Sequence, residues 1–161
     1  MKKVTIVIPN YNGEKYIDEC FSALTKQSYK DFDVILADNG SEDNSISKAC
    51  QYKDKLDLNI KKLNCNYGFA KAVNEGIRQS QAEYVILLNN DTHAGRHFVE
   101  NLLKAIEMEK DVFAAQALML QYNSPELVDS AGDYFCALGV AFSAGKDKKA
   151  SLYKKKKDIF S

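Results

Sequence analysis

Strand-like and helix-like segments alternate along this chain, and this alternation restricts its fold more than any other feature. Runs of β-branched and apolar residues predict strands at residues 4–8, 32–37, 58–63 and 83–88. Apolar residues that recur every four positions predict helices at residues 14–26, 45–52, 69–77 and 98–106. Strands that alternate with helices are joined by crossovers, so we predict an α/β fold with a mainly parallel sheet and helices on both faces.

The domain organisation follows from length and composition. A chain of 161 residues with 45% hydrophobic content predicts one domain with its own core. We assign residues 1–145 to this domain; beyond residue 111 the alternation stops, and residues 112–120 and 127–131 are strand-like. Residues 146–161 hold seven lysines and end in the apolar pair Ile159-Phe160. We therefore expect a lysine-rich segment that leads to further chain, and a Rossmann-like fold that is incomplete at its C-terminus.

Charge and cysteine content limit the partners and the compartment. The chain carries 22 basic and 22 acidic residues, so it lacks the positive surplus of a protein that binds nucleic acid, and we expect no nucleic-acid partner. The apolar run at residues 4–8 is too short for a signal peptide or a membrane span, and the four cysteines form no C-x-x-C pair. We expect a cytoplasmic protein with reduced, mostly buried thiols, whose lysine-rich segment permits contact at the membrane periphery.

Polar strings follow three of the predicted strands. They are P-N-Y-N-G at residues 9–13, D-N-G-S at 38–41 and N-N-D-T at 89–92. Ligands of parallel α/β sheets bind at the carboxyl ends of the strands, so these strings should converge on one rim. The first string is neither a G-x-G-x-x-G dinucleotide motif nor a P-loop. The rim is therefore expected to bind a ligand by other means.

The first two strings offer hydrogen-bonding groups and one aromatic ring. The first strand is expected to stop at Pro9, which with Tyr11 and Asn12 forms a rigid turn suited to a base or a sugar. An ordinary strand-to-helix turn is the alternative interpretation. Asp38 can accept hydrogen bonds from a base N–H or from ribose hydroxyls. Its alternative interpretation is a cap for the following loop.

The third string has the chemistry of a divalent cation site. Asn89, Asn90 and Asp91 supply hard oxygen ligands, which Mg²⁺ or Mn²⁺ takes together with substrate phosphates. A helix cap at Asp91 is the alternative. His93 and His97 are four residues apart, but no carboxylate of the H-E-x-x-H type lies between them, so we expect them on the surface.

Four ordered motifs connect the chain to a known family. They are V-T-I-V-I-P-N-Y-N-G at residues 4–13, V-I-L-A-D-N-G-S-E-D-N at 34–44, N-x-G-F-A-x-A-x-N-x-G at 66–76 and Y-V-I-L-L-N-N-D-T at 84–92. With these motifs in this order, the sequence resembles a family two glycosyltransferase of the GT-A fold. The N-N-D string is similar to the form found in rhamnosyltransferase-like members.

This resemblance implies a role for each matched residue. Pro9, Tyr11 and Asn12 are expected to wrap the sugar donor's nucleotide, and Asp38 to contact its base or ribose. Residues expected beside the nucleotide and the sugar are Asn66, Gly68, Lys71 and Asn74, joined by Asn89 and Asn90. Asp91 takes the last position of the family's D-x-D motif and is expected to hold Mg²⁺ or Mn²⁺ on the diphosphate, while Asn89 replaces the first carboxylate.

The implied reaction is inverting, metal-assisted transfer of a hexosyl or rhamnosyl group. The expected substrates are a UDP- or dTDP-linked sugar and a saccharide or lipid-linked acceptor, as in the biosynthesis of cell-surface polysaccharides. Transfer needs a general base for the attacking hydroxyl. The late carboxylates Asp129 and Asp133 are interpreted as structural, so we expect the base beyond Ser161 and no catalytic residue in this chain. The isolated chain is then expected to bind a nucleotide sugar without turning it over.

Two other functions stay open. A noncatalytic nucleotide-sugar-binding module would explain the missing base and the basic end. Nucleotidyl transfer would share the sheet and the metal, but it needs a glycine-rich, arginine-containing loop that residues 9–13 do not supply.

Overall fold

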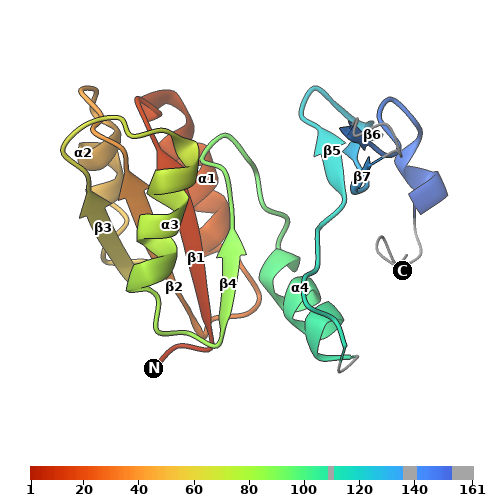
Figure 1. Ribbon diagram of the computed structural model, residues 1–161, viewed down its shortest axis with the longest axis horizontal. Coiled ribbons are helices and arrows are strands. Elements are labelled where there is room, and N and C mark those ends of the chain that lie inside the picture. The colour runs from red at the N-terminus through yellow and green to blue at the C-terminus, as the bar shows by residue number, and fades with distance from the viewer. Residues whose placement is uncertain (109–110, 136–140, 154–161) are drawn as a thin grey trace. The chain divides into compact units, whose positions relative to one another are not determined.

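A computed structural model describes residues 1–108, 111–135 and 141–153 of the chain. The chain forms two compact units, Met1–Glu100 and Asn101–Ser161 (Figure 1). The boundary expected between residues 145 and 146 lies inside the second unit.

The first unit is built on a four-stranded parallel sheet. Its strands are β1 (Val4–Asn10), β2 (Phe32–Asp38), β3 (Leu58–Lys62) and β4 (Tyr84–Leu87), in the order β3-β2-β1-β4. Val4 of β1 is in register with Phe32 of β2 and Tyr84 of β4. The predicted parallel α/β sheet is confirmed, and its strands all end at the same edge.

Strand β1 is the centre of the core, and it is longer than predicted. Every residue from Val4 to Asn10 is buried, which the unbroken apolar run indicates. The expectation that the strand stops at Pro9 is wrong, because β1 continues to Asn10. Pairing with β4 ends at Val7, so the missing N–H of Pro9 leaves no bond to β4 unmade.

Helices cover both faces of this sheet, as predicted. They are α1 (Glu14–Thr25), α2 (Ser45–Cys50) and α3 (Phe69–Gln79). Helix α3 crosses one face over β1 and β2, while α1 and α2 lie on the other (Figure 1). A Cβ at Gly76 would lie inside the contact distance of the Val7 side chain, so this glycine lets α3 approach the sheet.

Strand β4 is more exposed than its apolar sequence predicts. Val85 is 38% and Leu87 54% exposed, and burial alternates along the strand. The register places both residues on the same face of the sheet as Val7, which α3 covers farther along the sheet. Helix α3 packs on β1 and β2, and β4 is the edge strand beside β1. The α3-side face of β4 is therefore left exposed.

The second unit consists of short elements. Helix α4 (Phe98–Glu107) crosses the boundary between the units. The strands β5 (Met119–Gln121) and β6 (Ser124–Ser130) form one antiparallel pair, β7 (Asp133–Phe135) and β8 (Ala141–Ser143) form another, and a 3-10 helix spans Ala150–Tyr153. The prediction of a strand over residues 112–120 is wrong for residues 112–118, where Phe113 is 98% exposed.

Three further expectations concern the whole chain. Cys20 is buried as expected, whereas Cys50 and Cys65 are exposed, which corrects the expectation of mostly buried thiols; Cys136 lies outside the described residues. Of the lysine-rich segment, residues 154–161 also lie outside them. Within the described ranges, no helix has the length and hydropathy needed to cross a bilayer.

Candidate functional site

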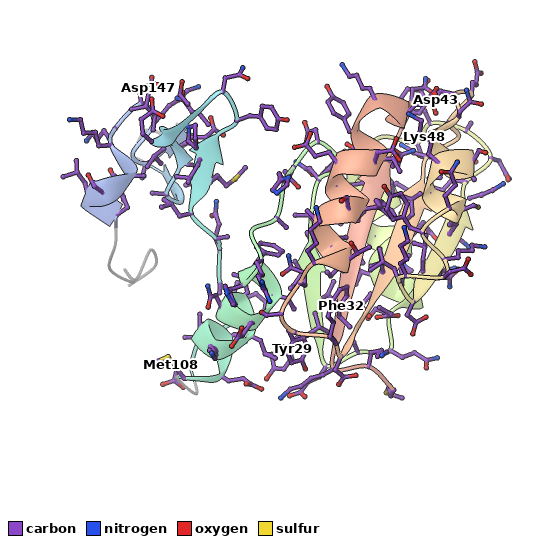
Figure 2. The ribbon with its side chains drawn as sticks, turned by 180° about the vertical axis from the view of Figure 1, so that it is seen from behind. Tyr29, Phe32, Asp43, Lys48, Met108 and Asp147 are labelled. Atoms are coloured by element: carbon purple, nitrogen blue, oxygen red, sulfur yellow. The ribbon has the colours of Figure 1, made fainter. Side chains whose placement is uncertain are left out.

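The carboxyl ends of the parallel strands carry a cleft of about 370 Å³. Asp43 and Lys48 mark this end of the first unit, and Phe32 and Tyr29 lie at the opposite end (Figure 2). The residues that line the cleft come from all three polar strings, from the loop before α3 and from the first turn of α3: Pro9, Asn10, Tyr11, Asn39, Asn66, Gly68, Phe69, Ala72, Asn89, Asn90 and Asp91. The predicted convergence of the three strings on one rim is therefore confirmed.

The carboxamide of Asn10 joins the first two strings. Asn10 is the last residue of β1 and is only 2% exposed. Its Nδ2 donates to Oδ1 of Asp38 at 2.8 Å and lies 2.9 Å from Oγ of Ser45 and 3.1 Å from Oγ of Ser41. An unpartnered buried amide would cost about 1–3 kcal/mol, so these bonds stabilise the arrangement of the strand ends.

The same carboxamide reaches the third string. Nδ2 of Asn90 donates to Oδ1 of Asn10 at 2.7 Å. A Cβ at Gly13 would collide with both side-chain amides, so only glycine leaves room for this bond. The loops after β1, β2 and β4 thus meet through one buried side chain.

Asp38 belongs to this network and does not line the cleft. It is 1% exposed, and its Oδ1 accepts hydrogen bonds from Asn10 and, at 2.6 Å, from Oγ of Ser41. Its Oδ2 accepts from the backbone N–H of Ser41 at 3.1 Å. Its carboxylate therefore acts inside the protein, on the side chains that shape the rim.

A second buried amide, Asn39, orders the loop before α3. Asn39 is 3% exposed; its Nδ2 donates to Oδ1 of Asn66 at 2.8 Å, and its Oδ1 accepts from the N–H of Tyr67 at 3.0 Å. The neighbouring Gly40 has φ +79°, and a Cβ there would come within 2.7 Å of Cα of Cys65. The loop after β2 therefore packs directly against the loop after β3.

Asp43 fixes the amino ends of two helices at this edge. Its Oδ2 accepts from the N–H of Glu14 in α1 at 2.8 Å, and its Oδ1 from the N–H of Ser45 in α2 at 3.0 Å. Partial burial opposes its ionisation, but the hydrogen bonds from Ser45 and Glu14 outweigh burial and lower the pKa of Asp43. An ion pair of 3.3 Å between Lys48 and Asp18 adds to the contact between the two helices.

Three further predicted site residues, besides Asp38, lie outside the cleft lining. Asn12 adopts a left-handed φ of 49° and donates from its N–H to Oγ of Ser41 at 2.9 Å. Nζ of Lys71 lies 4.5 Å from the ring centroid of Tyr67. Asn74 is exposed on α3. The structure thus places these side chains near the rim loops without bringing them into the cleft lining.

Asp91 is the carboxylate that the cleft offers to a cation. It is exposed, and the amide side chains of Asn89 and Asn90 line the same cleft. Among the described residues no three acidic, histidine or cysteine side chains come together as a metal site. Mg²⁺ is commonly held by one or two carboxylates together with substrate phosphates and waters, so a single carboxylate beside a diphosphate fits such an ion.

The loop that carries Asp91 rests on buried side chains. Cys20 is buried, and burial together with the charges of Asp91 and Glu19 raises its pKa to about 12. Farther along the loop, Nε2 of the buried Gln27 donates to the carbonyl of Gly95 at 2.8 Å, and its Oε1 accepts from the N–H of Val99 at 3.2 Å. The strand-to-helix segment after Asp91 is therefore anchored to Gln27, just after the end of α1.

The two histidines of this segment are surface residues, as expected. Nδ1 of His93 lies 3.2 Å from Oε1 of Glu19, and Nδ1 of His97 lies 3.0 Å from Oε2 of Glu100. Each is paired with a different carboxylate, and neither lines the cleft.

Aromatic rings border the cleft. Tyr11 is 48% and Phe69 62% exposed, and both line it. Tyr67, between the cleft-lining residues Asn66 and Gly68, is 48% exposed. Exposed rings beside hydrogen-bonding amides are suited to stack on a base or on the apolar face of a sugar.

The cleft lining includes some of the predicted site residues and not others. Predicted residues that line the cleft are Pro9, Tyr11, Asn66, Gly68, Asn89, Asn90 and Asp91; those that do not are Asn12, Asp38, Lys71 and Asn74. Sequence reasoning missed Asn10, Asn39, Phe69 and Ala72. Asn10 and Asn39 stand inside the polar strings, next to residues that were selected, and their position at the ends of buried strands was the available signal.

Comparisons with known proteins agree on one family. The family described as "Glycosyl transferase family 2" matches residues 5–138. Poly(ribitol-phosphate) beta-N-acetylglucosaminyltransferase TarS of Staphylococcus aureus is 29% identical over 110 residues, which is 66% of this chain and 19% of TarS. Glycosyltransferase GlyG of Streptococcus pneumoniae is 33% identical over 110 residues, which is 67% of this chain and 36% of GlyG. The chain thus spans between about a fifth and about a third of the length of these relatives.

Solved structures show the same architecture. A crystal structure of TarS residues 1–349 in complex with UDP has a TM-score of 0.64 and 25% identity, and covers 74% of this chain and 39% of that one. Mannosyltransferase PcManGT of Pyrobaculum calidifontis, in complex with GDP-Man and Mn²⁺, has a TM-score of 0.61 and 25% identity, and covers 64% of this chain and 32% of that one.

Proposed function

Because the chain belongs to glycosyl transferase family 2, we propose that its first unit, which has the parallel sheet of the GT-A fold, binds the nucleotide-sugar donor of a glycosyl transfer reaction. The observation that supports this function best is the cleft at the strand ends, where the three polar strings meet through Asn10. A structural relative carries UDP, which makes a nucleotide the first ligand to test.

The cleft offers each part of a nucleotide sugar a chemically suitable surface. The rings of Tyr11 and Phe69 present flat apolar surfaces for the base, and the amides of Asn66 and Asn90 present hydrogen-bonding groups for hydroxyls. We propose a UDP- or dTDP-linked sugar as the donor. The nature of the sugar, hexose or rhamnose, is left to the test.

We propose that Asp91 holds Mg²⁺ or Mn²⁺ against the donor diphosphate. A bound divalent ion would supply charge neutralisation to the leaving nucleoside diphosphate. The single exposed carboxylate suits this role because the diphosphate provides further oxygen ligands. The structure of PcManGT contains Mn²⁺, so Mn²⁺ is the first ion to test with this chain.

The transfer itself is proposed to be inverting, with an acceptor that is a saccharide or is lipid-linked. An attacking hydroxyl needs a base within hydrogen-bonding distance. Of the two late carboxylates, Asp133 accepts a hydrogen bond of 2.7 Å from Oγ of Ser143, which suits a structural role. We therefore propose that the base belongs to chain outside these 161 residues, and that the reaction serves cell-surface polysaccharide synthesis at the cytoplasmic side of the membrane.

Calorimetric titration tests the binding function. We expect the chain to bind UDP- or dTDP-sugars in the presence of Mn²⁺, and Asp91→Asn to weaken that binding. Asp31→Asn is the matched control, because Asp31 is an exposed carboxylate paired with Lys2 just before β2, whose other end carries the cleft. The proposed function would be contradicted if neither nucleotide sugar bound, or if both variants had the affinity of the unchanged chain.

A further inference from the structure

One buried side chain, Asn10, uses both ends of its carboxamide in the network beneath the cleft. Asn10 is 2% exposed and is paired with Asp38 at the end of the β1–β2 ladder. Its Nδ2 donates to Asp38, and its Oδ1 accepts from Asn90. Asn10 thus connects Asp38, at the end of β2, with Asn90, in the loop after β4. These two residues are 52 positions apart in the sequence.

The charge of Asp38 determines the direction of these bonds. A carboxylate can only accept, so it requires the nitrogen of the Asn10 amide, and the oxygen of that amide must then face Asn90. An amide oxygen also only accepts, so Asn90 has to present its own Nδ2 to Asn10. The two amides therefore cannot be turned over without placing one acceptor against another.

This direction determines what Asn90 presents to a ligand. With its Nδ2 bonded to Asn10, the oxygen of the Asn90 amide is on the other side of the group, and no described residue donates to it. Asn90 lines the cleft beside Asp91. The chain of bonds from Asp38 thus leaves an acceptor, rather than a donor, available next to the proposed cation ligand.

We propose that Asn10 is a positioning residue for the sugar donor: it transmits the orientation required by the buried carboxylate of Asp38 to the Asn90 amide at the cleft. This inference rests on the proposed donor-binding function. Asn10 orients the Asn90 amide by a hydrogen bond, and Asp38 in turn orients Asn10. Gly13 is part of the device, because any side chain at that position would displace the two amides from each other.

The experiment measures both the orientation of Asn90 and the affinity for a ligand. Nuclear magnetic resonance of the ¹⁵N-labelled chain reports the side-chain NH₂ group of Asn90, whose exchange with water is slow while it is bonded to Asn10. Titration with UDP-sugar and with dTDP-sugar in the presence of Mg²⁺ reports affinity. The variants are Asn10→Ala and, as a matched control, Thr5→Val, which removes another buried polar group of β1, one bonded to Asp33.

We expect Asn10→Ala to lose the slow exchange of the Asn90 amide and to weaken nucleotide-sugar binding about tenfold or more, the size of one buried hydrogen bond. Thr5→Val is expected to lower thermal stability while it keeps both the Asn90 signal and the affinity. This split separates positioning from a general loss of stability, which would affect both variants alike.

Exchanging the side chains of positions 10 and 38 provides a second test, in which the hydrogen bond to Asn90 should be restored. In the double variant Asn10→Asp with Asp38→Asn, the carboxylate at position 10 can accept from both neighbouring amides, so slow exchange of the Asn90 amide should return. Slow exchange in Asn10→Ala, or unchanged affinity in a variant that has lost it, would overturn the inference. If the unchanged chain binds neither nucleotide sugar, the proposed function fails, and the absence of slow exchange at Asn90 would still overturn the positioning of its amide.

Discussion

The two units of this chain differ in how each is stabilised internally. In the first unit the central strand β1 has parallel neighbours on both sides, and its seven residues are all buried. In the second unit the described strands form short antiparallel pairs, and Met119 and Leu120 of β5 are about 40% exposed. Every residue that lines the cleft belongs to the first unit. Rigid support and ligand chemistry thus coincide, and changes in the second unit should leave donor binding intact.

Removal of a core side chain in each unit gives the largest expected difference. Ile6 in β1 is 0% exposed, so Ile6→Ala should lower the free energy of unfolding by about 2–5 kcal/mol. Leu120 in β5 is 44% exposed, and Leu120→Ala should change it by only about 0.5 kcal/mol. Urea unfolding followed by circular dichroism measures both. Equal losses would contradict the difference in packing between the two positions.

The next comparison concerns the cleft carboxylate and a carboxylate of the second unit. Asp91→Asn removes the charge next to the proposed diphosphate site and should weaken Mn²⁺-dependent binding of UDP-sugar about tenfold or more. Asp129→Asn, in β6, should leave the affinity unchanged. Isothermal calorimetry compares the two. A loss of affinity in the β6 variant would contradict the assignment of donor binding to the first unit.

The third comparison concerns Asn39, an uncharged side chain that orders a loop of the rim. Asn39→Ala removes the bonds that hold Asn66 and the backbone of Tyr67, and should cost about 1–3 kcal/mol of stability. Nucleotide-sugar affinity should fall with it. Asn59→Ala is the control, because Asn59 is an exposed amide on β3. Thermal unfolding and titration of both variants measure the difference; identical behaviour would show that Asn39 does not order the loop.

The smallest expected effect is the pH dependence contributed by Asp43. Its pKa is lowered in the folded chain, so its contribution to stability is present above the ordinary value of 3.8 and is lost as pH falls below that value. Asp43→Asn should remove this part of the acid sensitivity. Urea unfolding at a series of pH values from neutral to acidic compares the variant with the unchanged chain. Parallel curves would show that Asp43 is not coupled to folding.

The contrast between the units also explains what the sequence could predict. Burial on both faces produces the unbroken apolar runs of β1 and β2, and such runs, alternating with helices, are easily recognised. The strands β7 and β8, which pair with each other, span three residues each and carry no comparable pattern. Strand β4 was predicted from its apolar residues, but its exposure depends on the position of α3, which no local pattern contains.

The same distinction applies to the site. Asp91, Tyr11 and Asn66 have recognisable chemistry within the motifs, so the sequence indicates them, and the structure places all three in the cleft lining. Asn10 was missed, because its importance depends on Asp38 and Asn90, which come from distant parts of the sequence. Asp38 was selected for its chemistry, yet the fold turns its carboxylate toward Asn10 and Ser41. Sequence reasoning thus identified the reactive types of residue and could not determine their directions.

Paramagnetic broadening by Mn²⁺ tests the central claim most directly. In ¹H–¹⁵N spectra of the chain saturated with UDP-sugar, or with dTDP-sugar if that is the ligand bound, substoichiometric Mn²⁺ should first broaden the amides of residues 89–91. The effect should then extend to the amides of Asn10, Tyr11, Asn66 and Gly68, which line the same cleft. The amides of Tyr29 and Phe32, at the opposite end of the same unit (Figure 2), should stay sharp at that concentration. Broadening centred on any other part of the chain, or none with either ligand, would contradict the account.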